Sequence, residues 1–257
     1  MKPMIQTKTH TLPRLFIRDG LENGAMVSLT AEQCHYVLHV MRLKAGASIR
    51  LFNGRDGEWL GVIEQCTRRE VILQITEQLR PQQPEPDCGL IFTPLKPEPM
   101  HFLIEKATEL GVSALFPVST AHSVARFQPE KIAAYAESAA EQSERLTIPA
   151  INPLMPFVDL LESWSTTHPI LLCDEAGGGR PLGEVIPGLN EGNYTIMVGP
   201  EGGFSHSELE LLRKLPYVIP VGLGPRILRA ETAALAALAC FQAVHGDWRM
   251  APRFISH

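Results

Sequence analysis

The sequence has little of three features that would each point to a particular class of protein. Its five cysteines are widely spaced and form no Cys-x-x-Cys pair, so neither a disulfide framework nor a zinc knuckle is predicted. Reduced cysteines favour a cytoplasmic protein. The longest apolar run, AALAALACF at Ala233–Phe241, is too short to cross a bilayer and is predicted to be a buried helix. The sequence therefore predicts neither a membrane protein nor a secreted one.

An excess of positive charge is also missing. The 257 residues carry a formal net charge of −5, which argues against indiscriminate binding to polyanions. The charge is unevenly distributed, however, because residues 1–86 hold 11 Lys and Arg against 9 Asp and Glu, and the remaining residues hold 12 against 19. A face that binds nucleic acid is therefore expected in the N-terminal part.

Several catalytic motifs are missing as well. The chain has no Gly-x-Gly-x-x-Gly, no P-loop lysine after a glycine-rich loop and no Gly-x-Ser-x-Gly elbow, which excludes the common dinucleotide, nucleoside-triphosphate and hydrolase sites. His35 and His39 stand four residues apart, as two metal ligands on one helix face would. No third ligand has matching spacing, so no metal is predicted, and a surface or RNA-facing role is favoured.

The first part of the chain reads as mainly β. Turn signals at Asn53–Gly54 and Asp56–Gly57 separate short runs rich in β-branched residues. The predicted strands lie at Leu15–Gly20, Ser48–Gly54, Glu58–Cys66 and Glu70–Gln78. One helix should begin at a capping box of Thr30 and Gln33 and end near Gly46. Its predicted apolar stripe is Tyr36, Val37, Val40 and Met41. The simplest arrangement is a small barrel with one helix.

A proline-rich stretch at Leu79–Asp87 predicts a stiff linker. We expect one domain over residues 1–80, a linker over 81–87 and a second domain over 88–257. In the second domain strand and helix patterns alternate, which predicts an α/β fold with a mostly parallel sheet. Helices are expected from about Met100 to Leu110, from about Pro129 to Ser143, after a capping box at Ser205 and Glu208, and at the C-terminal end to about His245.

Two glycine-bearing segments carry the strongest functional signal: GPEGGFS at Gly199–Ser205 and GLGPRILRAETAALAAL at Gly222–Leu238. Each follows a β-branched run and leads into a helical pattern, so both are predicted at the carboxyl ends of strands, where open α/β sheets bind ligands. Two such loops one strand apart predict a single pocket. Ser205 is better explained as a helix cap than as a nucleophile.

Together with KATELGVSALFPV (Lys106–Val118) and EQSER (Glu141–Arg145) followed by Pro149, these segments resemble the bacterial 16S ribosomal RNA uracil-N3 methyltransferases of the SPOUT superfamily. PRLFI (Pro13–Ile17) and His35–Gly54 resemble the PUA-like RNA-binding barrel of that family. The resemblance implies a deep trefoil knot in the C-terminal domain, a homodimer, S-adenosylmethionine as cofactor and 16S ribosomal RNA of the small subunit as substrate. A role in ribosome biogenesis is implied with them.

The resemblance also implies which residues line the methyl-donor pocket, and apolar walls with glycine-rich backbone suit a flat adenine ring. The implied residues are Leu172, Gly199, Pro200, Glu201, Gly202, Gly203, Leu223, Gly224, Ile227, Leu228 and Ala230. Three positions depart from the family's usual residues. Ala230 stands in place of a common threonine, His122 in place of a common arginine, and Thr147 where a second basic residue is often found.

Methylation at uracil N3 requires loss of a weakly acidic proton, so the site should offer cationic donors and a proton acceptor. Arg229 and Arg226 are the candidate donors, with Arg145 as a possible contribution from a partner subunit. Glu201 and Glu231 are the candidate proton acceptors. The alternative is that these arginines and glutamates form structural ion pairs that fix the loops. The candidate phosphate ligands of the first domain are Arg14, Arg18, Arg42, Lys44 and Arg55.

Two further interpretations stay open at the level of sequence. One is a SPOUT methyltransferase for another RNA position or for a ribose 2′-hydroxyl. The other is a non-catalytic RNA-binding assembly factor that keeps only a vestigial pocket. The intact GPEGG and LGPRILR segments argue against the second.

Overall fold

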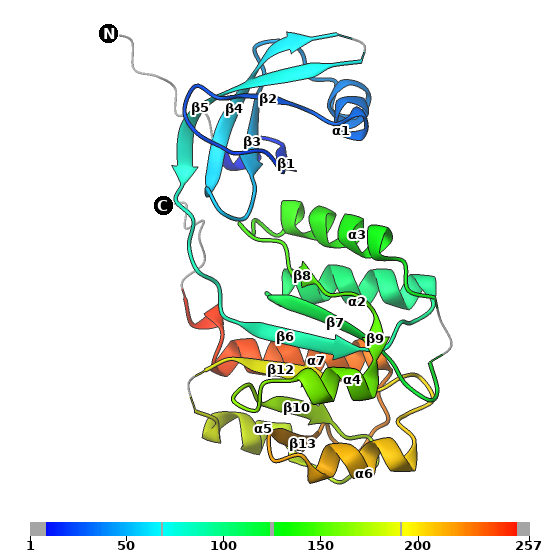
Figure 1. Cartoon of the computed structure of the whole chain (residues 1–257). Coiled ribbons are helices and arrows are strands. Elements are labelled where there is room, and N and C mark those ends of the chain that lie inside the picture. Colours follow the sequence, from blue (N-terminus) through cyan, green and yellow to red (C-terminus); the bar gives the residue numbers. More distant parts are fainter. Residues whose placement is uncertain (1–8, 68, 124–125, 191, 251–257) are drawn as a thin grey trace. The chain divides into compact units, whose positions relative to one another are not determined.

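The computed structural model describes residues 9–67, 69–123, 126–190 and 192–250 and divides the chain into two compact units (Figure 1). The first unit runs to Pro84 and also contains Ala140–Thr147, and the second holds Glu85–Ala139 and the chain from Ile148 onward. The sequence did not predict that Ala140–Thr147 joins the first unit. In the part of the chain that the structure describes, no helix is both long and apolar enough to span a membrane.

The first unit is built on a five-stranded sheet with the strand order β1-β3-β4-β5-β2. Its strands are β1 (Arg14–Phe16), β2 (Met26–Ser28), β3 (Ser48–Phe52), β4 (Glu58–Cys66) and β5 (Val71–Arg80). β1 pairs with β3 in parallel, and the other pairs are antiparallel. Side chains alternate along β5, so that Val71, Leu73 and Ile75 are buried in the core. The predicted strand Glu58–Cys66 is confirmed, and β2 was missed because it has only three residues.

The predicted helix of the first unit begins as expected but ends early. Thr30 and Gln33 form both hydrogen bonds of a capping box, which confirms the predicted start. α1 covers only Ala31–His35 and continues as one π-helical stretch, Tyr36–Val40 (η2). The wider π-turn rotates the following side chains out of a 3.6-residue stripe. The predicted stripe is therefore only partly correct: Val37 is buried and Met41 packs against the core, but Tyr36 and Val40 are exposed, and the buried Cys34 was not predicted.

Five charged side chains of the first unit, three of them buried and two half-buried, form what we call the Glu58 cluster: Arg14, Arg50 and Glu58, with Arg80 and Glu144. Glu58 accepts hydrogen bonds from Arg14 Nε at 2.5 Å and from Arg80 Nε and Nη2 at 2.9 Å. Glu144 receives a bidentate pair from Arg50, at 2.6 and 2.7 Å. Because Glu144 belongs to Ala140–Thr147, this cluster fixes that segment within the first unit.

The second unit is an α/β layer structure in which every recorded strand pair is parallel. Its sheet order is β11-β13-β10-β12-β6-β7-β8, and β9 pairs with β7. The strands are β6 (Cys88–Phe92), β7 (Ala114–Ser119), β8 (Ala150–Ile151), β9 (Met155–Pro156), β10 (Ile170–Cys173), β11 (Arg180–Pro181), β12 (Tyr194–Met197) and β13 (Val218–Gly222). The α/β class predicted from the alternating pattern is confirmed.

Helices cover both faces of this sheet (Figure 1). They are α2 (Pro97–Glu109), α3 (Pro129–Gln142), α4 (Phe157–Ser163), α5 (Leu182–Val185), α6 (His206–Lys214) and α7 (Ala230–Val244). Alternate strand residues face opposite layers: Leu90 packs with α2, α5 and α7, whereas Ile91 packs with α4 and α6. Because the strands are apolar at successive positions, both faces of the sheet must be covered, and helices cover them.

Candidate active site

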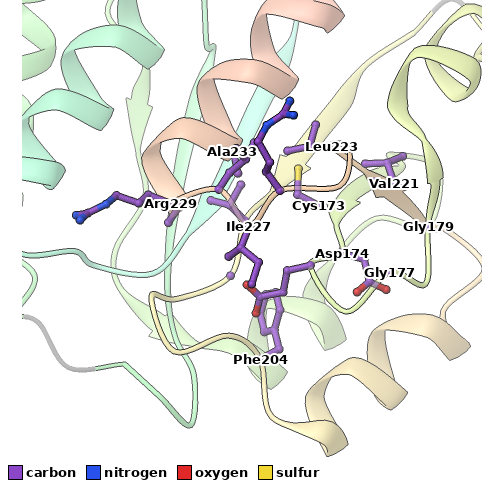
Figure 2. A pocket seen from close by; sticks show the side chains of 18 of the residues that line it. Cys173, Asp174, Gly177, Gly179, Phe204, Val221, Leu223, Ile227, Arg229 and Ala233 are labelled. Carbon is purple, nitrogen blue, oxygen red and sulfur yellow. The ribbon is translucent and has the colours of Figure 1, made fainter.

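A cavity of about 690 Å³ lies at the carboxyl ends of β10, β12 and β13 (Figure 2). Three loops form it: the residues after β10, the Gly199–Ser205 loop after β12, and the chain from Gly222 into α7. This is the edge of a parallel sheet at which ligands bind. The single pocket predicted from the two glycine-bearing segments is present, and its volume is that of a site for a small organic ligand.

The loop after β10 is fixed by a buried carboxylate, Asp174. Its Oδ2 accepts hydrogen bonds from Arg213 Nε at 3.1 Å and Nη2 at 2.6 Å, and its Oδ1 accepts one from the Ala176 amide at 2.9 Å. Arg213 belongs to α6, so this ion pair fastens the cavity wall to a helix. Burial raises the pKa of the neighbouring Cys173 thiol to about 12, so this cysteine is neutral at physiological pH and no nucleophile.

The loop after β12 approaches the cavity through glycine. A Cβ at Gly199 would lie 3.0 Å from the Phe204 ring, which itself lines the cavity, so any larger residue here would require that ring to shift. Gly203 adopts φ +71°, a backbone conformation that favours glycine. Its carbonyl contacts His122 Nδ1 at 2.8 Å. The loop then enters α6 through the capping box of Ser205 and Glu208, as predicted.

The entrance of α7 presents two arginines. Arg229 is the N-cap residue of α7, and both Arg226 and Arg229 are exposed. In Figure 2 the Arg229 side chain extends away from Cys173 and Val221. Neither guanidinium has a recorded hydrogen bond or ion pair with another described residue. The helix N-terminus adds its own partial positive charge, so this side of the cavity favours anionic groups.

The alternative of Arg–Glu ion pairs is not observed within the described ranges. Glu201 instead lies 3.9 Å from Lys96 Nζ, in a pair whose side chains are both well exposed. Glu231 stands in the first turn of α7 and lines the cavity. Ile227, at the same rim, is 90% exposed. The cavity therefore combines cationic donors, four acidic residues (Asp174, Glu175, Glu201 and Glu231) and an uncovered apolar side chain.

Most of the predicted cofactor and catalytic residues meet at this cavity. Those that line it are Gly199, Pro200, Glu201, Leu223, Gly224, Arg226, Ile227, Leu228, Arg229, Ala230 and Glu231. Leu172, Gly202 and Gly203 are not among the lining residues, and Leu172 packs into the core between the sheet and α4. Arg145 belongs to the first unit, where it is buried and donates from Nη2 to Thr147 Oγ1 at 3.1 Å.

On the wall after β10 only Leu172 was predicted, and the residues that do line the cavity there were not. Asp174, Glu175, Gly177 and Gly179 line it, and so does Lys96. The run AGGG at Ala176–Gly179, directly after a predicted strand, was the signal that could have identified this wall. The ion pair that holds it could not be found, because Asp174 and Arg213 are 39 residues apart.

Of the predicted phosphate ligands in the first unit, Arg14 requires a correction. Its side chain is 3% exposed, it donates to Glu58 and to the carbonyls of Ala140 and Arg145, and its guanidinium lies 3.7 Å from the centroid of the Phe52 ring. Because its donors are used inside the unit, Arg14 cannot reach a phosphate. The other four residues, Arg18, Arg42, Lys44 and Arg55, are exposed, and their role stays a prediction.

Metal ligands were not predicted. Within the described residues, no three His, Cys, Asp or Glu side chains come together in a way that could hold an ion. His35 and His39 lie near each other, with ring centroids 4.9 Å apart, and both are exposed.

Comparison with known proteins agrees with this architecture. A model of the RNA methyltransferase domain matches residues 82–242, and a model of the RNA methyltransferase PUA domain matches residues 29–76. The ribosomal RNA small subunit methyltransferase E of Rickettsia conorii is 33% identical over 229 residues, which cover 88% of this chain and 93% of the relative. The solved structure of the Neisseria gonorrhoeae ribosomal RNA small subunit methyltransferase E, bound to S-adenosyl methionine, superposes with a TM-score of 0.83. It is 28% identical and covers 92% of this chain and 99% of its own.

The α/β unit with its strand-end cavity matches an RNA methyltransferase domain, and the small β unit matches the PUA domain of RNA methyltransferases. The class of the protein is therefore that of the RNA methyltransferases. Within that class, identity of 33% over most of both chains decides the family. The chain belongs to the family of ribosomal RNA small subunit methyltransferase E.

Proposed function

We propose that this protein methylates N3 of a uridine in 16S ribosomal RNA of the small subunit, with S-adenosylmethionine as methyl donor. Membership of the family supports the reaction class. The observation that carries the proposal is the cavity itself. Two arginines that have no side-chain partner among the described residues stand beside apolar walls at the entrance of α7.

The lining of the cavity fits the proposed cofactor. Val198, Phe204 and Leu223 offer apolar surface for a flat heteroaromatic ring, and the loop backbones offer hydrogen-bonding groups close to the ligand. The exposed carboxylates of Glu175 and Glu201, which both line the cavity, suit the positive charges of the amino acid part and of the sulfonium. When bound, S-adenosylmethionine supplies a methyl group on a positively charged sulfur, which is already activated for displacement.

The residues of this chain would then act on the uridine. N3 loses its proton to Glu201, Glu231 or a water molecule that one of them holds. N3 forms the new bond to the methyl carbon, and the electron pair of the broken carbon–sulfur bond stays on sulfur. Negative charge that develops on the uracil oxygens is stabilised by Arg226 and Arg229. Alignment of the two reactants by the three loops supplies a further part of the rate.

We also propose that the protein acts as a homodimer in the cytoplasm. Ile227 is 90% exposed at the rim of the cavity. A partner subunit on this rim would remove Ile227 from water. Light scattering with size-exclusion chromatography tests this: a monomer at micromolar concentration would contradict the proposal.

The reaction is tested with the full chain, S-adenosylmethionine labelled in its methyl group, and three substrates: naked 16S RNA, isolated small subunits and whole ribosomes. Digested RNA is analysed by mass spectrometry of nucleosides. We expect labelled 3-methyluridine, and the substrate that yields it identifies the assembly stage at which the enzyme acts. RNA from cells that lack the protein should lose the same nucleoside.

The two alternatives give different results in the same experiment. Label in a 2′-O-methyl nucleoside, or in a base other than uracil, would replace the proposed reaction by another RNA methylation. Calorimetry that detects no binding of S-adenosylmethionine, together with retained RNA binding, would support a non-catalytic assembly factor.

A further inference from the structure

A second cavity, of about 420 Å³, lies in the second unit between the start of α2, the residues before α3 and the first turns of α3. Its floor is apolar: Leu95, Met100 and Ile132 are all buried. Tyr135 lines it as well, and its ring stacks on His101 with centroids 4.1 Å apart at 29°. The stacking holds the tyrosine ring in one orientation. The cavity therefore offers a flat aromatic side chain over an apolar floor.

The rest of the lining is cationic. Lys96, Arg126 and Lys131 line the cavity, all three are exposed, and no carboxylate is among the lining residues that the structure describes. Arg126 and Lys131 have no recorded hydrogen bond or ion pair with another described side chain. Glu105, which lies 3.4 Å from His101, is itself engaged by Lys106 Nζ at 2.6 Å. The cations are thus available to an anionic ligand.

Lys96 lines both this cavity and the active-site cavity. The two cavities therefore adjoin at one side chain, and a ligand that spans them would pass Lys96. A ligand with flat rings at regular intervals and a negative charge between successive rings is a single-stranded polynucleotide. A protein partner would not need an aromatic platform and three exposed cations in one small cavity.

We propose that the second cavity binds the nucleotide next to the target uridine in the RNA substrate. This inference rests on the proposed function, because it places the target base in the first cavity. The flanking base packs on Tyr135 and on the apolar floor, and Gln128 offers an amide to its edge. Arg126 and Lys131 contact its phosphate, and Lys96 contacts the phosphate that joins the two nucleotides.

The test uses the full chain and the RNA or subunit that the wild-type protein methylates. In the variant Arg126→Ala/Lys131→Ala, both replaced side chains are exposed, so the fold should be retained. We expect its dissociation constant for RNA to rise at least tenfold near 0.1 M salt. The slope of log K against log salt should fall in magnitude by about 1.4, since two ionic contacts with a single strand are lost.

A charge-matched control removes two exposed cations elsewhere in the second unit, Lys214→Ala/Arg249→Ala. RNA affinity of this control should stay within twofold of the wild type. Tyr135→Ala should weaken RNA binding at least fivefold, whereas Tyr135→Phe should keep it. Calorimetry with S-adenosylmethionine should give the same dissociation constant for every variant, because none of these residues lines the first cavity.

Photo-cross-linking locates the flanking nucleotide on the protein directly. RNA with 4-thiouridine next to the target uridine, on one side or the other, is irradiated with the protein, and the cross-linked peptide is identified by mass spectrometry. A cross-link to the peptide that contains Tyr135 supports the inference. A double variant that binds RNA like its charge-matched control overturns it. A double variant that becomes monomeric but keeps its RNA affinity also overturns it, because a partner subunit would then fill the cavity.

Failure of the proposed function is distinguishable from this. A wild-type protein that binds S-adenosylmethionine but methylates no RNA or subunit overturns the proposed reaction. RNA affinity and cross-linking of the variants still decide whether the second cavity binds a nucleotide.

Discussion

Arginine stands in two opposite environments in the two units of this protein. In the Glu58 cluster, Arg14 and Arg50 are at most 7% exposed and their donors are used by Glu58, by Glu144 and by backbone carbonyls. At the active-site cavity Arg226 and Arg229 are exposed, with no recorded side-chain partner among the described residues. The residue type is the same, and its surroundings decide whether it stabilises the fold or is available to a substrate.

The difference has a simple physical origin. A guanidinium removed from water must be matched by carboxylates and carbonyls, and each of those is then committed to the fold. An exposed guanidinium keeps its hydration and loses little until a ligand displaces the water. Substitutions should therefore separate stability from catalysis: changes in the Glu58 cluster should unfold the protein, and changes at the α7 entrance should stop methyl transfer in a folded protein.

The largest effect is expected for Glu58→Ala. The substitution leaves Arg14 and Arg80 buried or half-buried without their carboxylate, which should lower the free energy of unfolding by about 3 to 5 kcal/mol. Denaturant unfolding followed by circular dichroism measures it. Glu105→Ala removes a partly exposed carboxylate from an ion pair with Lys106 and should cost less than about 1 kcal/mol. Equal losses for the two variants would contradict the structural role of the cluster.

Acid should weaken the same cluster. Burial alone would raise the pKa of Glu58, but the hydrogen bonds and charges of Arg14 and Arg80 outweigh it, so the pKa lies below its ordinary value. A carboxyl with a lowered pKa in the folded state stabilises the protein above the pKa of the unfolded chain, near 4.5. That contribution is lost as the pH falls through the folded value. Glu58→Gln should reduce the acid-dependent part of the unfolding free energy, and an unchanged pH profile would count against the assignment.

Arg229→Ala should give the converse result. Methyl transfer to RNA should fall by about 10²- to 10³-fold if the guanidinium stabilises charge on the uracil oxygens. The free energy of unfolding should change by less than about 0.5 kcal/mol, because the side chain is exposed. Single-turnover methylation and denaturant unfolding measure the two quantities on one preparation. Full activity of this variant on its RNA would remove Arg229 from the proposed site.

A smaller effect is expected at Asp174 and Arg213, where an ion pair holds one wall of the proposed cofactor cavity. Arg213→Ala leaves the Asp174 carboxylate buried with a single amide donor, so the wall after β10 should loosen. We expect a loss of about 1 to 3 kcal/mol in stability and a weaker affinity for S-adenosylmethionine. A double-mutant cycle with Asp174→Asn should give a coupling of at least about 0.5 kcal/mol. Additive effects would show that the two side chains act independently.

Local signals predicted the parts of the fold that depend on neighbours in sequence. Both capping boxes, at Thr30 and at Ser205, are present because each needs only residues three positions apart. α1 ended early because no sequence period announces a π-helical stretch. The strands β8, β9 and β11 were missed because each has two residues and depends on a partner strand for its definition.

Prediction of the site was limited in the same way: features set by neighbouring residues could be predicted, and contacts between distant residues could not. The loops after β12 and β13 could be predicted, since their glycines follow β-branched runs directly. The role of Arg14 could not, because its partners Glu58 and Ala140 lie 44 and 126 residues away. The sequence EQSER was noted for its resemblance, but only the structure shows its physical use. There the Glu141 carboxylate accepts from the Phe16 amide, and Glu144 accepts from Arg50.

The smallest effect should come from His122. Its side chain is exposed, as that of Arg229 is, but it contacts a backbone carbonyl, as that of Arg14 does. Its ring is exposed, and its Nδ1 meets the Gly203 carbonyl at 2.8 Å. His122→Ala should therefore cost about 0.5 to 1.5 kcal/mol at most and raise the dissociation constant of S-adenosylmethionine only a few-fold. His122→Arg introduces the residue common in the family and a permanent donor. If the guanidinium donates to the same carbonyl, calorimetry will give wild-type affinity. An affinity as weak as that of the alanine variant would mean that the imidazole ring itself, and not a donor at this position, holds the Gly203 loop.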